Sequence, residues 1–139
     1  MELGMKKTVI VAVALLAGVT WMTSVQARPN KRFDERTQMC RMIGEGRLDW
    51  ESEAWGLGGK KFQEVCKGCH AKGNDKGAPA LYSQSYTSKG WNTIFASRRV
   101  PCARNGSWGV LSEDEIQFIN DYLYRNAAWT FDPNSSDSC

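Results

Sequence analysis

Apolar residues recur at helical spacing most clearly near the end of the chain. Ile116, Ile119 and Leu123 lie three to four positions apart, so they share one face of a helix. The preceding sequence Ser112-Glu113-Asp114-Glu115 has the form of a capping box, with acidic residues where the helix dipole favours them. This pattern predicts an amphipathic helix whose apolar stripe belongs to the core.

Shorter stretches predict two helices before this one. The segment 88–98, with Trp91 and Phe95 among its apolar residues, indicates a short helix. Another helix is expected over about residues 55–68. Glycine and proline residues mark the segment 100–110 as a loop.

The pattern is weaker toward the N-terminus. Asp34 is placed to cap a short helix that carries Met39 and Ile43 on one face and ends at Gly44. Residues 48–59 are mixed in character and predict a linker or turn. No convincing strand is visible, so the expected fold class is all-α, with three to five helices in one small domain.

The first residues have the features of a secretory signal peptide. Lys6 and Lys7 precede a short apolar run over residues 9–19, and a small-residue cleavage site ends at Ala27. A permanent membrane anchor is the alternative, although the run is short for a membrane span. We therefore expect export, to the periplasm or the cell exterior, of a mature chain of 112 residues without a transmembrane span.

These boundaries divide the chain into four parts. Residues 1–27 form the leader, and residues 28–54 form an N-terminal extension with a short helix. Residues 55–128 form the main helical domain. Residues 129–139 are polar and predict a flexible C-terminal tail.

Composition and charge narrow the choice of partners. Hydrophobic residues make up 42% and charged residues 24% of the chain, as in globular proteins. Residues 60–104 hold nine basic and two acidic residues, whereas residues 105–139 hold one basic and six acidic residues. The basic segment is interpreted either as a solvated face or as a docking surface for acidic partner proteins. Nucleic acid is not expected as a partner, because the chain is exported and its net charge is small.

The chemistry of the chain is concentrated in the sequence Cys66-Lys67-Gly68-Cys69-His70, the C-x-x-C-H signal for attachment of haem c. Two thiols on one helical turn reach the two vinyl groups of one porphyrin, and the adjacent imidazole serves as proximal iron ligand. His70 is the only histidine, which excludes sites built from several imidazoles. The motif predicts one covalent haem, which also adds apolar core to a small domain.

Three alternatives to haem attachment exist for these cysteines. A zinc site needs Cys40 and Cys102 to complete its ligands, and the chain has no second C-x-x-C pair. A thioredoxin-like dithiol needs a βαβ setting, which the pattern does not show. The last alternative is a structural disulfide between Cys66 and Cys69. Haem attachment accounts best for the adjacent histidine.

The sequence around the motif resembles class I c-type cytochromes over about residues 55–126. Gly58 and Phe62 stand where that family has a glycine and an aromatic residue that pack on the C-terminal helix. Pro79 resembles the family's proline, whose carbonyl accepts a hydrogen bond from the proximal imidazole. The resemblance implies a cytochrome c-like domain with the cofactor-binding residues Cys66, Cys69, His70, Phe62 and Pro79, of which His70 is the iron ligand.

The chain departs from this family at the second axial ligand of the iron. Family members usually place a methionine before the last helix, whereas this chain has no methionine after Met42 and has Val100-Pro101-Cys102 there. A Cys102 thiolate, favoured by neighbouring arginines, is the candidate distal ligand and lowers the potential. The alternatives are a disulfide from Cys102 to Cys40 or Cys139, a returning Met39 or Met42, a lysine, a tyrosine, a partner's side chain, or an open position.

Five tryptophans follow the leader, at positions 50, 55, 91, 108 and 129. They are expected to pack in the core or to line a haem pocket, where they lower the local dielectric around the iron.

The resemblance implies an electron carrier rather than an enzyme. Such a protein passes single electrons between exported redox partners, as a free shuttle or as a subunit of a redox complex. The missing distal methionine favours a second hypothesis, a haem-based sensor or ligand-binding protein. A third is a subunit in which the haem has a structural role.

Overall fold

The computed structural model describes residues 28–128 and residue 139. The predicted leader lies outside these residues, and so does the predicted tail except for Cys139. Within the described residues, no helix combines the length and apolar character needed to cross a membrane.

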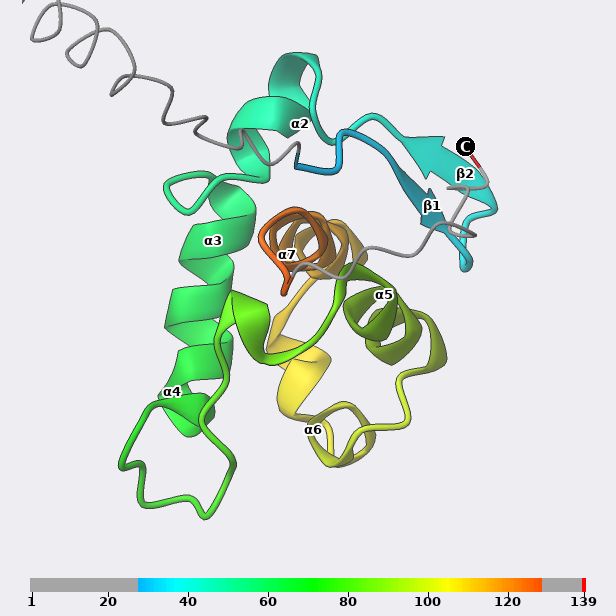
Figure 1. Cartoon of the computed structure of the whole chain (residues 1–139). Helices are drawn as coiled ribbons and strands as arrows, with labels where there is room; N and C mark the ends of the chain where they lie inside the picture. Colours follow the sequence, from blue (N-terminus) through cyan, green and yellow to red (C-terminus); the bar gives the residue numbers. More distant parts are fainter. Residues whose placement is uncertain (1–27, 129–138) are drawn as a thin grey trace, which may run out of the picture.

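Helices dominate the described part of the chain, and one two-stranded sheet precedes them (Figure 1). The elements in chain order are β1 (Arg32–Asp34), β2 (Met39–Arg41), α2 (Gly46–Glu51), α3 (Leu57–Lys61), the π-helical turn η1 (Phe62–Cys66), α4 (Lys67–His70), the 3₁₀ turn η2 (Ser83–Ser85), α5 (Ser88–Ser97), α6 (Pro101–Arg104), the 3₁₀ turn η3 (Ser107–Val110) and α7 (Glu113–Arg125). The mainly helical prediction is therefore confirmed, and the all-α prediction is wrong in omitting the sheet.

The predicted short helix capped by Asp34 is also wrong, because β1 and β2 form an antiparallel hairpin there. Arg32 and Asp34 are buried, so β1 directs polar side chains toward the protein interior. The apolar alternation that marks a strand is consequently missing from the sequence. Asp34 supports the turn instead, since its carboxylate accepts a hydrogen bond from the Arg36 backbone N–H at 3.0 Å.

Short helices occupy segments that predict linkers or loops. α2 overlaps the start of the linker predicted over residues 48–59, and α6 and η3 lie within the predicted loop over residues 100–110. Each is six residues or shorter, too short to show an apolar stripe over two turns.

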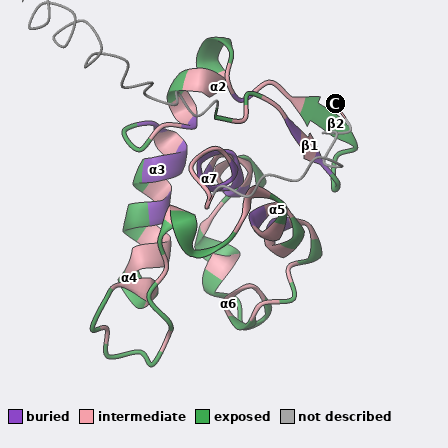
Figure 2. Ribbon diagram, viewed as in Figure 1, coloured by how far each residue is buried: buried purple, intermediate pink, exposed green. Residues whose placement is uncertain are grey.

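α7 is the centre of the fold, and α3 and α5 pack against it. Figure 1 shows α7 end-on between these two helices, and Figure 2 shows buried positions on all three. The core cluster consists of Phe62, Trp91, Phe95, Ile116, Ile119, Tyr122 and Leu123. The predicted apolar stripe of the last helix is thus confirmed as core, and so is the capping box that joins Ser112 and Glu115.

Gly58 lets α3 cross α7 at close range. A Cβ at this position would lie 2.1 Å from the Phe118 carbonyl oxygen and 2.9 Å from the Tyr122 Cβ, so a larger residue does not fit. Phe62 follows one turn later and packs on Tyr122, with ring centroids 5.8 Å apart. This is the helix crossing implied by the resemblance, and the structure confirms it.

We expect Gly58→Ala to lower the free energy of unfolding by about 1–3 kcal/mol, because the added methyl group forces α3 away from α7. Gly68→Ala is the matched control, since Gly68 is also helical and an added Cβ there meets nothing within 4 Å. The control is expected to gain about 0.5–1 kcal/mol from better helix propensity. Urea unfolding measures both values, and equal stability of the two variants would contradict the close crossing.

The N-terminal extension is joined to the helical domain through a buried ion cluster. The Arg32 Nε donates a hydrogen bond to the Asp121 carboxylate of α7 at 2.8 Å, and the Arg41 Nε donates to the same carboxylate at 2.9 Å. Arg32 and Asp121 are both fully buried. These ion pairs join the hairpin to α7.

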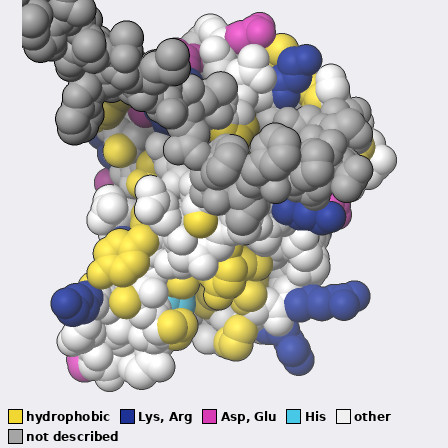
Figure 3. Space-filling view, viewed as in Figure 1, with side chains coloured by type: hydrophobic (Ala, Val, Ile, Leu, Met, Phe, Trp, Pro, Cys, Tyr) yellow, Lys and Arg dark blue, Asp and Glu magenta, His cyan; other side chains and the backbone are white. Residues whose placement is uncertain are grey.

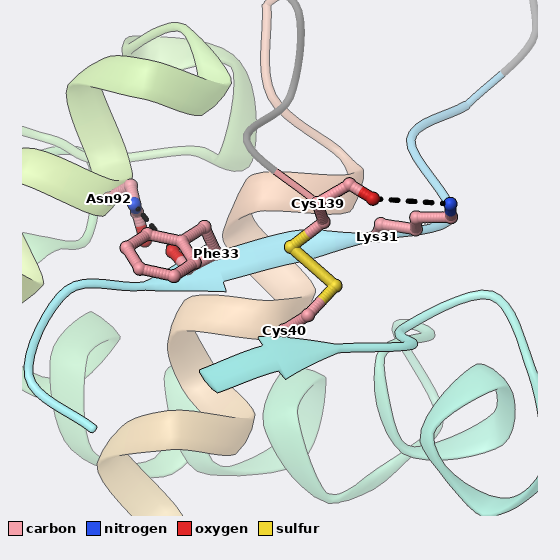
Figure 4. Close-up of a disulfide and its surroundings, with 5 residues drawn as sticks. All are labelled: Lys31, Phe33, Cys40, Asn92 and Cys139. Atoms are coloured by element: carbon pink, nitrogen blue, oxygen red, sulfur yellow. Dashed lines mark hydrogen bonds between the residues drawn. A yellow bond between two sulfur atoms is a disulfide. The ribbon is translucent and has the colours of Figure 1, made fainter. Parts of the chain in front are cut away.

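A disulfide between Cys40 of β2 and Cys139 closes the chain on itself (Figure 4). Lys31 donates a hydrogen bond to the Cys139 carbonyl at 3.5 Å, and Asn92 of α5 donates to the Phe33 carbonyl at 3.0 Å. These contacts tie the hairpin both to the end of the chain and to α5.

The tryptophans differ widely in burial. Trp91 is only 3% exposed, and Trp108 stacks on a core phenylalanine with ring centroids 5.0 Å apart. Trp50 and Trp55 are 62% and 54% exposed, so the expectation that they pack in the core is wrong. Trp50 lies in α2 and Trp55 in the turn that follows it, and their rings contact each other edge to face. Trp129 lies outside the described residues.

Candidate functional site

The C-x-x-C-H motif lies at the end of one long helical run. α3, η1 and α4 follow one another without a break from Leu57 to His70, where the pattern predicts a helix ending at Gly68. The π-helical turn within this run ends at the first motif cysteine, and such turns are frequent at functional sites. Cys66 is half-buried against the core cluster, whereas Cys69 is exposed.

The His70 ring is oriented by a carbonyl from the loop that follows α4. Its Nδ1 lies 2.7 Å from the Pro79 carbonyl oxygen. Because a carbonyl can only accept, Nδ1 carries the proton and donates this bond, which leaves the lone pair of Nε2 free for a ligand bond. The contact that the resemblance implies between Pro79 and the proximal imidazole is therefore present.

Two residues that the sequence analysis does not single out, Lys67 and Asn74, also reach this loop. The Lys67 ammonium donates to the Leu81 carbonyl at 2.8 Å, and the Asn74 side chain donates to the Ala78 carbonyl at 2.7 Å. An asparagine in a glycine-rich loop is a turn signal, and this signal was available for Asn74. Lys67 lies inside the C-x-x-C-H motif, but at one of its variable positions, so the motif assigns it no role.

Apolar side chains gather beside the motif. Figure 3 shows hydrophobic atoms on the face of the molecule that carries the histidine. The partly buried apolar residues packed against the core are Cys66, Leu81, Ile94, Trp108, Leu111 and Ala127. Phe62 lies deeper, at 2% exposure, and its packing on Tyr122 makes it a helix-crossing residue. Its contact with a cofactor stays a prediction.

Burial, together with smaller effects of the neighbouring Cys102 and Cys69, raises the pKa of the Cys66 thiol to about 12. The effect of Cys102 on Cys66 places α6 close to the motif. A thiol with so high a pKa is a poor nucleophile at neutral pH.

We expect iodoacetamide to alkylate Cys69 well before Cys66 in haem-free protein at pH 8. A rise in pKa of three units lowers the thiolate fraction of Cys66 about a thousandfold, and raising the pH toward 12 should restore its reactivity. Peptide mapping of the alkylated cysteines at several pH values measures this order. Faster alkylation of Cys66 would show that its thiol is not buried as described.

Cys102 lies in α6, half-buried and unbonded. The alternative in which it pairs with Cys40 or Cys139 is wrong, because those two cysteines are bonded to each other. The nearby Arg98 guanidinium is paired with Glu113, and this hydrogen bond lowers the pKa of the Glu113 carboxyl. Because its charge is paired, Arg98 is less available to stabilise a Cys102 thiolate than the sequence implies.

Met39 is not placed to act as an iron ligand. It lies in β2 and is 62% exposed. Figure 1 shows β2 at the opposite end of the molecule from α4. The hairpin holds this methionine away from His70.

The structure also bears on the three other uses of the cysteines. Cys40 is bonded to Cys139 and cannot serve as a zinc ligand. Among the described residues, no three His, Cys, Asp or Glu side chains are grouped to hold a metal ion. Cys66 and Cys69 are not bonded to each other, and the only strands in the described ranges form a hairpin rather than a βαβ unit.

Part of the basic segment is neutralised by ion pairs. Lys61 pairs with Glu115, Lys76 with Asp75, and Arg98 with Glu113. The exposed basic residues of this segment without an ion pair to another described residue are Lys60, Lys72, Lys89, Arg99 and Arg104. Figure 3 shows Lys and Arg side chains on both sides of the apolar face that carries the histidine.

Comparisons with known proteins leave the site to be interpreted from its own residues. No family model, no curated protein and no solved structure matches the chain. Its function must be inferred from the motif, the geometry around His70 and the surface beside them.

Proposed function

We propose that this chain is a monohaem c-type cytochrome that carries single electrons between exported redox partners. Cys66 and Cys69 bind the haem through thioether bonds, and His70 provides the proximal iron ligand. Cys102 is assigned as the distal ligand. The protein acts as an electron carrier, either free or within a redox complex, and not as an enzyme.

The observation that carries the proposal is the His70 ring held by the Pro79 carbonyl at the end of a C-x-x-C-H helix. The donor set fits haem c, because the motif offers two thiols and an imidazole whose Nε2 lone pair is free. The hydrophobic atoms on the face that carries the histidine provide a surface suited to a porphyrin (Figure 3). The Cys40–Cys139 disulfide supports export to an oxidising compartment such as the periplasm.

The chain's own residues have distinct roles in this function. Haem iron supplies the one-electron chemistry when bound. Pro79 orients His70 and increases its basicity through the hydrogen bond to Nδ1, which stabilises ferric iron. The exposed basic residues of segment 60–104 that have no ion pair to another described residue attract an acidic docking surface on a partner, in a contact of the small and transient kind.

The proposal is tested by expressing the full chain in a bacterial host that matures c-type cytochromes. The wild-type protein is expected to be coloured and to carry the mass of one haem. Cys66→Ala/Cys69→Ala is expected to lose the covalent haem, whereas Cys40→Ala, which removes a cysteine far from the motif, should keep it. A colourless wild-type protein at its bare peptide mass would refute the proposal.

The distal ligand and the docking surface need separate measurements. An unchanged ferric absorption spectrum in Cys102→Ala would rule out Cys102 as iron ligand. Reduction by an acidic redox protein should slow as salt is added, because screening weakens attraction between exposed charges. A haem that no redox partner reduces at useful rates would count against the carrier function.

The absence of a methionine after Met42, together with the distant position of Met39, favours one alternative function. In this alternative the distal position is open and the protein binds a small ligand such as CO or NO. A shift of the ferrous absorption spectrum on adding CO would support ligand binding. No shift would remove this alternative and leave the carrier.

A further inference from the structure

The loop from His70 to Leu81 is braced from within by a single side chain, Asn74. The Asn74 Nδ2 donates to the Ala71 carbonyl at 2.9 Å and to the Ala78 carbonyl at 2.7 Å. Its Oδ1 accepts from the Lys76 N–H at 2.9 Å and from the Ala78 N–H at 3.3 Å. The Asn74 amide group therefore links Ala71 on one side of the loop to Ala78 on the other. Ala78 is the residue that precedes Pro79.

The base of the same loop is closed by Lys67. Its ammonium donates to the His70 carbonyl at 3.3 Å and to the Leu81 carbonyl at 2.8 Å, and it lies 4.1 Å from the centre of the Tyr82 ring. The Leu81 N–H adds a backbone hydrogen bond to the His70 carbonyl at 3.0 Å. The residue two positions after Pro79 is thus fixed to the end of α4.

Pro79 lies between these two braces. Asn74 holds Ala78 on one side, and Lys67 together with the His70 carbonyl holds Leu81 on the other. Proline has no N–H of its own with which to anchor the backbone at this position. The orientation of the Pro79 carbonyl toward the His70 Nδ1 therefore depends on its neighbours Ala78 and Leu81. These two residues are held by the side chains of Asn74 and Lys67.

We propose that Asn74 and Lys67 are positioning residues that hold the Pro79 carbonyl on His70 and thereby set the reduction potential of the haem. This inference rests on the proposed function, since it concerns the proximal ligand. A strong bond from Nδ1–H to Pro79 makes the imidazole a better donor and stabilises ferric iron. Loosening either brace weakens that bond and raises the potential.

The test compares two variants with two matched controls in the haem-loaded protein. Asn74→Ala removes the inner brace, and Lys67→Met removes the ammonium while keeping an unbranched side chain. Lys72→Met changes the charge equally at an exposed lysine of the same loop. Asn126→Ala removes hydrogen bonds to the Ser52 and Tyr122 carbonyls at the far end of α7.

Two readouts separate positioning from simple loss of stability. Redox titration gives the midpoint potential, and NMR gives the hydrogen-exchange rate of the His70 Nδ1 proton. We expect Asn74→Ala and Lys67→Met to shift the potential upward and to speed this exchange. The upward shift of the midpoint potential in Lys67→Met must exceed the shift in Lys72→Met. Asn126→Ala must leave the exchange rate of the His70 Nδ1 proton unchanged.

The possible results are distinguishable. Wild-type protein without haem would overturn the proposed function, and this inference with it. If the haem-loaded Asn74→Ala and Lys67→Met variants have the same potential and exchange rate as their controls, the positioning role of Asn74 and Lys67 is refuted. The proposed function would not be affected by this result. If Asn74→Ala does not accumulate, Asn74→Ser and Lys67→Met carry the same test with the same decisive outcomes.

Discussion

Replacing Asp121 with asparagine is expected to lower the free energy of unfolding by about 3–5 kcal/mol. The Asp121 carboxylate accepts hydrogen bonds from Arg32 at 2.8 Å and from Arg41 at 2.9 Å, and it is fully buried. The remaining Arg32 hydrogen bonds go to the neutral side chains of Asn92 and Gln117. Without Asp121, the buried Arg32 guanidinium has no ion-pair partner among the described residues.

Urea unfolding with a fitted m-value measures this loss. Asp75→Asn is the control, because Asp75 is paired with Lys76 at the surface and its side chain is 84% exposed. The control should change stability by less than about 1 kcal/mol. A loss in Asp121→Asn no larger than in Asp75→Asn would show that the ion cluster does not hold the hairpin.

The second large effect is expected from removing the disulfide. Cys40→Ser/Cys139→Ser should lower the free energy of unfolding by about 2–4 kcal/mol. The bond joins residues 99 positions apart, so the cross-linked unfolded chain is strongly restricted. The variant should also unfold with a larger m-value, because its unfolded chain exposes more surface.

Asp75→Asn, which leaves the cross-link intact, serves as the control for the disulfide as well. Wild-type protein in excess reductant should reproduce the stability of the double variant. If the double variant and the wild type unfold at the same urea concentration, the bond between Cys40 and Cys139 does not constrain the chain.

Much of the helical domain was predictable because its signals are local. The spacing of Ile116, Ile119 and Leu123 and the capping box at Ser112 are properties of neighbouring residues, and the structure confirms α7 from them. The C-x-x-C-H motif is equally local, which is why Cys66, Cys69 and His70 stand out without a fold.

The hairpin was not predictable in the same way. Its inward side chains, Arg32 and Asp34, are polar, and Arg32 is stable there only because Asp121 comes from a helix 89 residues away in sequence. Local hydrophobic pattern carries no information about such a partner. The helix expected at Asp34 was therefore wrong for a reason that lies outside the segment itself.

The sequence alone displayed the C-x-x-C-H motif and predicted the two main packing helices, because these depend on residues within a few turns of one another. The glycine at the helix crossing was implied by the family resemblance, and its contact with α7 is a tertiary one. Only the tertiary structure decided that Cys40 pairs with Cys139 and leaves Cys102 free beside the motif. It also decided that Asn74 and Lys67 brace the loop that orients His70. The disulfide and the bond from Lys67 to Leu81 depend on where the chain returns in space, and residue spacing does not encode that position. The Asn74 bonds are local, and the structure decided only which backbone groups of the loop they reach.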